Sequence, residues 1–233
     1  MSSISATPDT PTIVDDDKWT TGDFALISSD NVRFRIDSYH LQAASVVFRD
    51  MITAADGPRE IHFTDDAIEG RHAVSAFLHL ATAGSLYEAP TPWNVSGTVK
   101  LVRFVLKFDC VTALKVLILR TKETLIDNDQ TTTLHVFIIG AVLDNEDLCR
   151  ASLKRNQDYY WIEGEPDTIE ATSYLLHGFC FNPQTWSFSA FGLIPLPHLW
   201  ALNRAWTMTK SNRAKLPDKF CELLKVAKAY KPE

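Results

Sequence analysis

The chain is poor in glycine, with nine in 233 residues. It contains no phosphate-cradling glycine loop, no dinucleotide-binding fingerprint and no Gly-x-Ser-x-Gly nucleophile turn. These absences argue against a nucleotide held by the backbone and against serine-hydrolase chemistry. We therefore predict no cofactor.

Cysteine is also scarce, and its spacing does not suit metal binding. The four cysteines, Cys110, Cys149, Cys180 and Cys221, lie 31 to 41 residues apart and form no Cys-x-x-Cys pair. Structural zinc sites draw their ligands from closely spaced pairs. We therefore expect each cysteine to be a small buried hydrophobe, with its thiol kept reduced inside the cell.

The seven histidines form no His-x-x-x-His or His-Glu-x-x-His pattern. His72 and His79 lie seven residues apart and could share a helix face, but the sequence offers no obvious third ligand. The adjacent carboxylates Asp65 and Asp66 stand where a helix would begin, and helix capping accounts for them. The sequence therefore predicts a protein that is not an enzyme and that binds no metal.

Long apolar runs are absent as well. No stretch reaches the roughly 18 residues that a membrane span needs, and residues 1–18 lack the apolar core of a signal peptide. We therefore expect no membrane partner and a location in the cytoplasm or nucleus. The net charge of -6 argues against a nucleic-acid partner, because phosphate binding needs a concentrated basic surface. The basic run at residues 210–215 is interpreted as a solvated loop and helix start.

The composition that remains is typical of a globular protein, with 45% hydrophobic and 22% charged residues. Its densest structural signal is at residues 23–51. Residues 24–27 are apolar on both faces, which predicts an inner strand. Residues 28–31 read Ser-Ser-Asp-Asn and predict a tight turn. In residues 32–36 apolar side chains alternate with two arginines, which predicts a strand with one buried face.

A helix is expected after this hairpin. Its apolar face would carry Leu41, Ala44, Phe48 and Met51, at spacings of three, four and three residues. Asp37 or Ser38 could accept a hydrogen bond from the free amides at the helix start.

The whole run resembles the opening of a BTB (POZ) domain, most closely in the BTB proteins of filamentous and mushroom-forming fungi. The matching positions are Asp23, Ser29, Asp30, Phe34, Arg35, Ile36, Leu41, Ala44, Ser45, Phe48, Arg49, Asp50 and Met51. The chain departs from the family pattern at Asp37 and Ser38, where His-Lys is usual. It also has Val46 in place of a common proline and Asn31 in place of the turn glycine. The first change removes basic character from a groove that some members use for binding.

Further elements are expected along the chain. We predict a strand at residues 60–64, then helices at about 71–84, 95–108 and 111–125. Two short helices around a turn at Asp144 and Asn145 resemble a shortened BACK-like extension. The fold class predicted is α+β, mostly α, with a BTB-type sheet covered by a helical bundle and followed by further helices.

The domain organisation follows from these elements. We expect a disordered acidic tail at residues 1–18, a BTB domain at 19–128, a BACK-like extension at 129–160 and a helical C-terminal region at 161–233. The last region should hold a linker at 161–166 and a helix from Pro166 to about His177. A face formed by Leu199, Leu202 and Trp206 should follow. A final helix from Pro217 should bury Phe220, Leu223, Leu224, Ala227 and Tyr230.

Aromatic residues gather in this C-terminal region. The group consists of Trp186, Phe188, Phe191, Trp200 and Trp206. It admits two interpretations, a core for the C-terminal helices or an exposed anchor patch for a partner.

The resemblance implies a protein-interaction module. BTB domains self-associate, often as homodimers that bury the first helix, although the segment before Trp19 lacks the apolar strand that many members exchange, which leaves a monomer open. An alternative is a substrate adaptor of a cullin-RING ubiquitin ligase, with the cullin scaffold as partner. The resemblance suggests interaction residues Asp23, Arg35 and Asp37 around the groove, and Ser45, Val47 and Phe48 on the first helix. For each of these the alternative is packing or capping within the fold.

Overall fold

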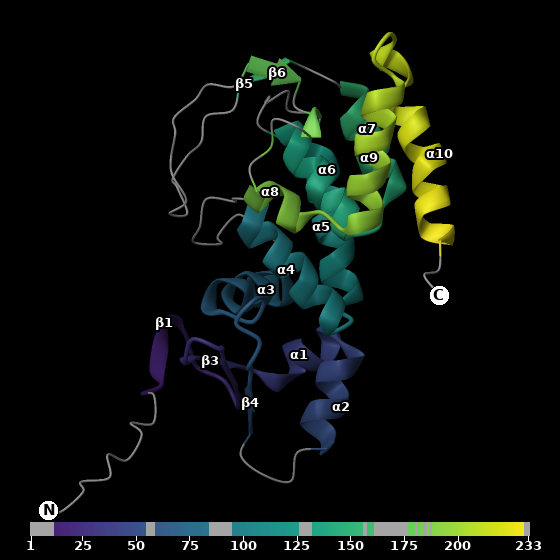
Figure 1. Cartoon of the computed structure of the whole chain (residues 1–233). Helices are drawn as coiled ribbons and strands as arrows, with labels where there is room; N and C mark the ends of the chain where they lie inside the picture. The colour runs from purple at the N-terminus through teal and green to yellow at the C-terminus, as the bar shows by residue number, and fades with distance from the viewer. Residues whose placement is uncertain are drawn as a thin grey trace, which may run out of the picture. The chain divides into compact units, whose positions relative to one another are not determined.

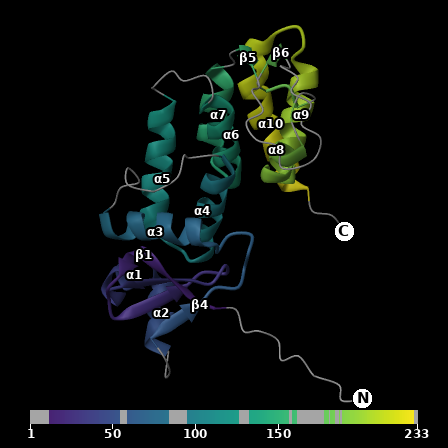
Figure 2. The ribbon, with the colours of Figure 1, turned by 90° about the vertical axis from the view of Figure 1, so that its left-hand side faces the viewer.

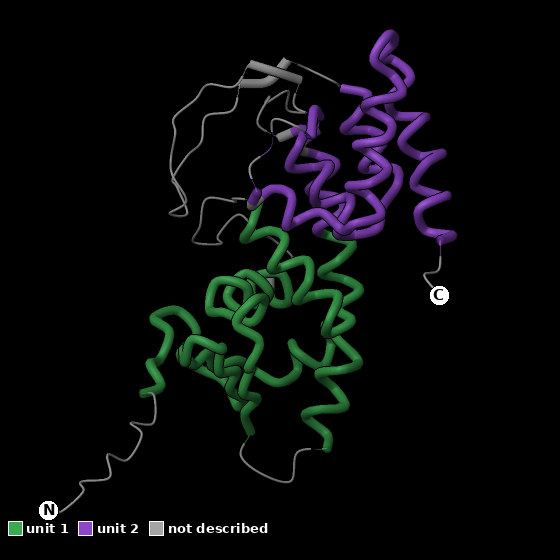
Figure 3. The backbone as a smooth tube through the Cα atoms, viewed as in Figure 1, with its two compact units in different colours: residues 1–116 green, residues 117–233 purple. Residues whose placement is uncertain are grey.

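The computed structural model describes residues 12–54, 59–83, 95–125, 132–155, 158–160, 177–179, 181–183, 186 and 188–230. The chain divides into two compact units, residues 1–116 and 117–233 (Figure 3). Helices dominate and the strands form small sheets (Figure 1), so the predicted class, α+β and mostly α, is confirmed. Among the described helices, none combines the length and the apolar character needed to cross a membrane.

The first unit is built on a four-stranded sheet with the order β1-β3-β2-β4. The strands are β1 (Val14–Thr20), β2 (Phe24–Ile27), β3 (Val32–Ile36) and β4 (Glu60–His62). Strand β2 is antiparallel to β3 and parallel to β4, while β1 runs parallel to β3.

The β2–β3 hairpin has the predicted form. All four residues of β2 are buried, and Phe34 and Ile36 turn inward from β3 while Arg35 is exposed. At the turn, Asn31 takes a left-handed φ of 61°, which asparagine tolerates better than most residues. The amide of Asn31 donates to the Ser28 carbonyl oxygen at 2.9 Å, which closes the turn. Alternation along the sequence therefore identified both strands.

Strand β1 corrects the predicted disordered tail for residues 14–18, while residues 1–11 lie outside the described part of the chain. The Val14 amide donates to the Asn31 carbonyl oxygen at 2.9 Å, and Arg33 pairs with Asp15 at 3.3 Å. The Asp16 carboxylate accepts the amides of Lys18 and Trp19 at 2.9 and 3.0 Å. Backbone pairing and these local bonds order a segment that buries little apolar surface.

The single helix predicted from residue 38 onward is two helices, α1 (Ser38–Ala44) and α2 (Val46–Ala54). Between them Ser45 is extended, with φ -153° and ψ 136°. Leu41 and Phe48 are fully buried as expected, whereas Met51 is 37% exposed. The break therefore turns the end of the second helix away from the predicted inward face.

The core of the first unit lies where α3 (Arg71–Ala83) and α4 (Val95–Lys107) cover the sheet; Figure 2 shows α3 between the strands and most of α4. Its centre is a cluster of phenylalanine rings from α2, the end of β4, α3 and α4. Neighbouring rings in this cluster lie 4.7 to 5.5 Å apart between centroids, within the range of favourable aromatic pairs. Its members are Phe48, Phe63, Phe77, Phe104 and Phe108.

Helix α4 ends at a tight turn in which Asp109 has a φ of 48°, and α5 (Val111–Thr124) follows. The Cys110 amide donates to the Val105 carbonyl oxygen at 2.8 Å, which satisfies one of the free carbonyls at the helix end. The predicted boundary between these two helices is confirmed.

The second unit begins within α5, at Leu117, and continues with the predicted helix pair, α6 (Thr132–Val142) and α7 (Glu146–Arg155). The turn between them has Asp144 at a φ of 53°, and the Asn145 carboxamide oxygen accepts the Leu148 amide at 3.0 Å as the cap of α7. Gly140 allows the two helices to approach closely, because a Cβ atom there would lie 2.9 Å from the Leu148 Cβ.

Among the described residues, the rest of the second unit holds a small two-stranded sheet and four helical segments. These are β5 (Asp158–Tyr160), β6 (His177–Phe179), α8 (Phe188–Leu193), α9 (Leu196–Met208), the 3-10 turn η2 (Arg213–Lys215) and α10 (Leu216–Ala229). Helices α9 and α10 run side by side in both views (Figures 1 and 2). The expected inward faces hold for Leu202, Trp206 and Phe220, but Tyr230 is 75% exposed because α10 ends before it.

The helix predicted from Pro166 to about His177 falls mostly on residues 161–176, outside the described residues, and His177 itself belongs to β6. The basic run at 210–215 is a turn followed by η2, and three of its six residues are basic. All of these basic residues except Arg213 are exposed, in line with the predicted solvated loop.

Candidate interaction surface of the first unit

Asp23, at the start of the hairpin, is the centre of a polar cluster. Its carboxylate accepts the Ser38 amide at 2.6 Å and the Ser38 hydroxyl at 3.0 Å. It also pairs with Arg59 at 2.7 Å. The hydrogen bond from the Ser38 backbone, helped by the Ser38 hydroxyl and Arg59, holds the pKa of Asp23 below its usual range against the opposing effect of desolvation. Asp23 therefore caps α1 from 15 residues away.

This arrangement corrects the predicted cap. Asp37 occupies the N-cap position by its backbone but makes no side-chain hydrogen bond to the helix. Ser38 is nearly buried and donates its hydroxyl to Asp23 instead of accepting a helix amide. Arg59 was missed because nothing in its local sequence links it to residue 23; the Ala25 amide donates to the Arg59 carbonyl oxygen at 2.9 Å and brings it alongside.

The three predicted groove residues meet at the end of the β2–β3 hairpin. Phe24 faces Ile36 across the hairpin, so Asp23 and Asp37 follow on opposite strands at the same end. Arg35 lies one position back, opposite Ala25, and is exposed, as is Asp37. This end of the sheet therefore presents two carboxylates beside two guanidinium groups.

The three predicted first-helix residues differ in their exposure. Ser45 is 4% exposed, donates its hydroxyl to the Phe108 carbonyl oxygen and accepts the Phe48 amide at 3.1 Å as the cap of α2. Phe48 is fully buried, with its ring centroid 4.8 Å from that of Phe108, and Val47 is half-buried. For Ser45 and Phe48 these contacts are those of fold-stabilising residues, and burial argues against a surface role.

Helices α1 and α2 nevertheless expose apolar side chains whose exposure was not predicted from the sequence, and for Met51 this corrects the predicted inward position. Tyr39 is 71% exposed, Val46 54% and Met51 37%. Their exposure was not predicted because the sequence pattern indicates one continuous helix. The break at Ser45 changes which side chains of α2 face outward. The available sequence signal for the helix break was Ser45, since serine is a preferred N-cap residue for a helix that follows it.

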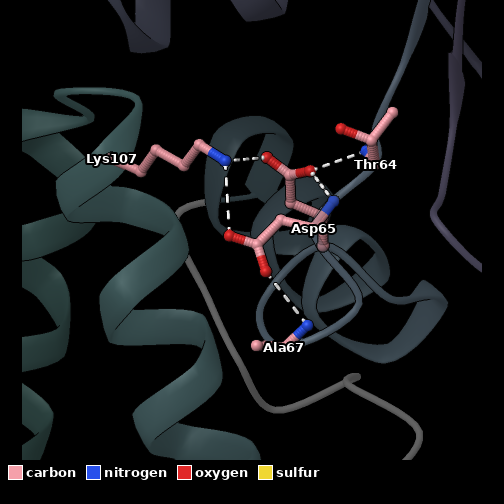
Figure 4. Close-up of polar contacts among 5 residues, drawn as sticks. Thr64, Asp65, Ala67 and Lys107 are labelled. Carbon is pink, nitrogen blue, oxygen red and sulfur yellow. Dashed lines mark hydrogen bonds and ion pairs between the residues drawn. The ribbon is translucent and has the colours of Figure 1, made fainter.

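A second polar cluster joins the segment after β4 to the end of α4 (Figure 4). The Glu69 carboxylate, with a side chain only 4% exposed, accepts the amides of Thr64 and Asp65 at 2.9 and 2.7 Å. Its other oxygen pairs with Lys107 at 2.7 Å, and Lys107 also lies 3.5 Å from the Asp65 carboxylate. Asp65 in turn accepts the Ala67 amide at 3.1 Å. The predicted helix start at Asp65 and Asp66 is wrong, because residues 66–68 form a turn and α3 begins only at Arg71. The Asp65 and Glu69 carboxylates accept amides of this turn and its approach instead of capping a helix.

The Lys107 ammonium is stabilised in its charged form. Its hydrogen bond to Glu69, together with the charges of Glu69 and Asp65, raises the pKa of Lys107 above the ordinary value, against the opposing effect of desolvation. An amine that must be neutral to act as a nucleophile or base is disfavoured by this environment. The cluster holds a loop against a helix rather than activating a group for chemistry.

The cysteines lie in environments that suppress thiolate formation. Cys110, Cys149 and Cys221 are buried free thiols, as predicted, while Cys180 lies outside the described residues. Burial raises the pKa of Cys110 to about 12 and that of Cys221 to about 11. Burial likewise raises the pKa of Cys149. Since the thiolate is the reactive form, these side chains are poor nucleophiles.

The candidate metal pair is not supported by the described residues. His72 is exposed at the start of α3, whereas His79 is 2% exposed and packs edge-on against Trp19, with 5.3 Å between ring centroids. Across the described part of the chain, no three His, Cys, Asp or Glu side chains gather in a way that could hold a metal ion.

The aromatic group of the second unit divides between the two interpretations. Trp186 and Trp206 are each 7% exposed and belong to the core, with Phe191 half-buried against Trp186. Phe188 is 89% exposed on α8 and Trp200 is 44% exposed on α9. Neither interpretation, core of the C-terminal helices or exposed anchor patch, therefore holds for all five aromatic residues.

Comparison with known proteins adds no family. No protein-family model matches this chain, and no curated protein matches it.

Proposed function

We propose that the first unit is a BTB-type protein-interaction module, that the chain self-associates through it, and that it acts by binding rather than by catalysis. The order of elements supports the BTB assignment. A β2–β3 hairpin is followed by the helices α1 and α2, by β4 parallel to β2, and then by α3, α4 and α5. This order agrees with the small sheet covered by helices that the resemblance implies.

The observation that carries the proposal is the exposure of apolar side chains on α1 and α2. Tyr39, Val46 and Met51 lie on helices whose inner residues are already packed against the phenylalanine core. Exposed apolar side chains on neighbouring short helices suit burial against a second protein surface. The resemblance places the first helix at the contact between two copies, and symmetric pairs are the commonest assemblies.

The polar groups of the first unit favour binding over catalysis. The shifted groups Asp23 and Lys107 are both held in their charged forms by hydrogen bonds that stabilise the fold. Catalytic acids and bases instead need pKa values close to the working pH. Binding in the cytoplasm or nucleus is the matching location.

Light scattering after size exclusion tests self-association. The wild-type chain is expected to elute with the mass of two copies at about 50 μM, in the range of ordinary protein affinities. Val46→Glu places a charge on the exposed apolar surface and should give the mass of one copy. Val226→Glu, at a residue of the second unit that is 57% exposed, is the matched control and should leave the mass unchanged. A wild-type monomer, or a dimer that Val46→Glu leaves intact, would refute the proposal.

A second candidate, a substrate adaptor of a cullin-RING ubiquitin ligase, is favoured by the helix pair that follows the module. Helices α6 and α7 stand where the resemblance places a BACK-like extension, and Gly140 lets them pack closely. Calorimetry with the N-terminal domain of the BTB-binding cullin from the same organism tests this role. Micromolar or tighter binding that Arg35→Glu weakens would support it, whereas no heat of binding would exclude it.

A further inference from the structure

Helix α9 presents a row of exposed side chains spaced four residues apart, which we name the α9 ridge: Leu196, Trp200, Arg204 and Met208. Leu196 is 76% exposed, Trp200 44% and Met208 53%, and Arg204 is exposed as well. Residues four apart lie almost above one another on a helix, so the row forms a continuous ridge about 18 Å long.

The opposite face of α9 is anchored in the second unit. His198 is 3% exposed, and Leu202 and Ala205 are fully buried. The Arg213 guanidinium lies 3.3 Å from the centroid of the buried Trp206 ring and donates to the Trp206 carbonyl oxygen. The helix is therefore held firmly by its inner face while the ridge stays accessible.

The charged residues of the chain segment that contains the ridge are of one sign. The sequence has no Asp or Glu between Glu170 and Asp218, although the whole chain carries a net charge of -6. The charged residues within this interval are Arg204, Lys210, Arg213 and Lys215. Arg204, Lys210 and Lys215 are exposed, and none has an ion-pair partner among the described residues, while Arg213 is engaged with Trp206 and Thr209.

We propose that the α9 ridge binds an acidic amphipathic helix of a partner protein. A ridge of residues four apart packs into the groove of another helix, and Trp and Arg are the residues that most often dominate binding energy at interfaces. Arg204 stands between Trp200 and Met208, so an occupant must supply a carboxylate beside its apolar side chains to complement the row. The partner helix therefore carries apolar residues at i, i+3 or i+4, and i+7, flanked by Asp or Glu.

This inference goes beyond the proposed self-association and does not depend on it. The residues that carry it lie in the second unit, whereas the self-association surface lies on α1 and α2 of the first. Either one can fail while the other holds.

A displayed library of helical peptides about 16 residues long, panned on the full chain, tests the proposal. Panning uses the double variant Trp200→Ala with Arg204→Glu as the counter-target. The matched control carries changes of the same kind on the neighbouring helix α10, Lys225→Glu with Val226→Ala, at exposed positions that are not part of the ridge. Circular dichroism and thermal unfolding establish that all three proteins are folded.

The expected result is enrichment of acidic amphipathic sequences. By calorimetry, the synthetic peptides should bind the wild type and the α10 control equally, and the ridge variant at least tenfold more weakly. Leu196→Asp, at a residue that makes little contact with the core, should weaken binding in the same way and serves if the double variant is unfolded. Failure to enrich any sequence, enrichment of neutral or basic sequences, or equal binding to Leu196→Asp would overturn the proposal.

Two further measurements separate other occupants. Vesicles containing phosphatidylserine are added to the same proteins, and binding that needs the ridge in the absence of any enriched peptide would replace a partner helix by a membrane surface. Light scattering of Leu196→Asp is the second measurement. A loss of the wild-type mass in that variant would replace the partner helix by a second copy of this chain. Unchanged mass and no ridge-dependent vesicle binding accompany the expected result.

Discussion

Ser45 determines where the first helical segment divides. Its hydroxyl caps α2 through the Phe48 amide and at the same time donates to the Phe108 carbonyl oxygen, 63 residues away. A side chain that satisfies two buried backbone groups is costly to replace, because both groups lose their partner together.

We predict that Ser45→Ala lowers the free energy of unfolding by about 2 kcal/mol, the sum expected for a lost cap and a buried carbonyl left unpaired. Urea denaturation followed by circular dichroism measures the change. Thr53→Ala is the control, since Thr53 donates only to the exposed Arg49 carbonyl oxygen within the same helix. Its cost should stay under about 0.5 kcal/mol. Equal costs for the two variants would contradict the role of Ser45.

Lys107 balances a carboxylate that is removed from water. We predict that Lys107→Met, which keeps the hydrocarbon stem, destabilises the fold by about 1 to 2 kcal/mol because the buried Glu69 carboxylate loses its ion-pair partner. The figure is modest since the Lys107 side chain is itself 44% exposed and partly screened by solvent. Arg71→Met should cost under about 0.5 kcal/mol in the same urea titration, because its pair with Asp30 is exposed and 3.8 Å long. A larger loss of stability in Arg71→Met than in Lys107→Met would contradict the role given to Lys107.

His198 makes stability depend on pH. Burial is the main cause that lowers its pKa below 6.5, and the positive charge of Lys228 on α10 acts in the same direction. The Asp144 carboxylate, 3.3 Å from the Nε2 atom, opposes them. Because the unfolded chain then binds this proton more readily than the folded one, stability is full above pH 6.5 and falls as the pH drops toward the folded pKa.

The urea concentration at the unfolding midpoint is therefore predicted to decrease as the pH is lowered from 7.5 to 5.5. His198→Gln should remove most of this pH dependence. His72→Gln is the control, since His72 is exposed at the start of α3 and should leave the slope in place. If the pH dependence of the urea midpoint persists in His198→Gln and disappears in His72→Gln, it belongs to His72 and the assignment to His198 is wrong.

At the scale of elements, alternation and helical period predicted those segments whose burial follows a regular pattern. Strands β2 and β3, the stripe of α4 and the α6–α7 turn at Asp144 are of this kind. The period could not reveal the break at Ser45, because apolar spacing continues across it. It could not reveal the capping by Asp23 or the Arg59 pair either, since both depend on contacts distant in sequence.

The candidate site was predicted in part for the same reason. Asp23, Arg35 and Asp37 lie at one end of the hairpin because its register fixes their positions, and their role in binding stays a prediction. The exposure of side chains on α1 and α2 depends on the helix break, so the exposure of Tyr39 and Val46 was not predicted. Strand β1 was missed because three consecutive aspartates predict disorder, whereas its order comes from backbone pairing with β3.

Strand β1 should be the least protected part of the sheet. It lies at the edge, and its pairing with β3 is irregular between Asp15 and Thr20. Hydrogen exchange followed by mass spectrometry is expected to show β1 amides exchanging at least tenfold faster than those of β2, which is paired on both sides. Equal protection of the two strands would mean that β1 opens only when the whole sheet does.

At the scale of the whole molecule, charge distinguishes the two proposed surfaces. Two copies that each carry a net charge of -6 repel one another, whereas Arg204 and the other basic residues of its chain segment attract an acidic helix. Raising the salt concentration from about 50 to 500 mM shortens the screening length severalfold. Self-association should therefore strengthen, and peptide binding at the ridge should weaken, when sedimentation and calorimetry are compared at the two concentrations. A common direction for both would contradict one of the assignments.

The buried cysteines give each unit its own built-in probe of local opening. Cys110 lies in the first unit, and Cys149 and Cys221 lie in the second. A thiol that is sealed from solvent and held protonated reacts with an alkylating reagent only during the moments when its surroundings open. With Cys180 replaced by serine, the labelling rates of these three positions would record how often each unit opens, without any probe being added to the chain.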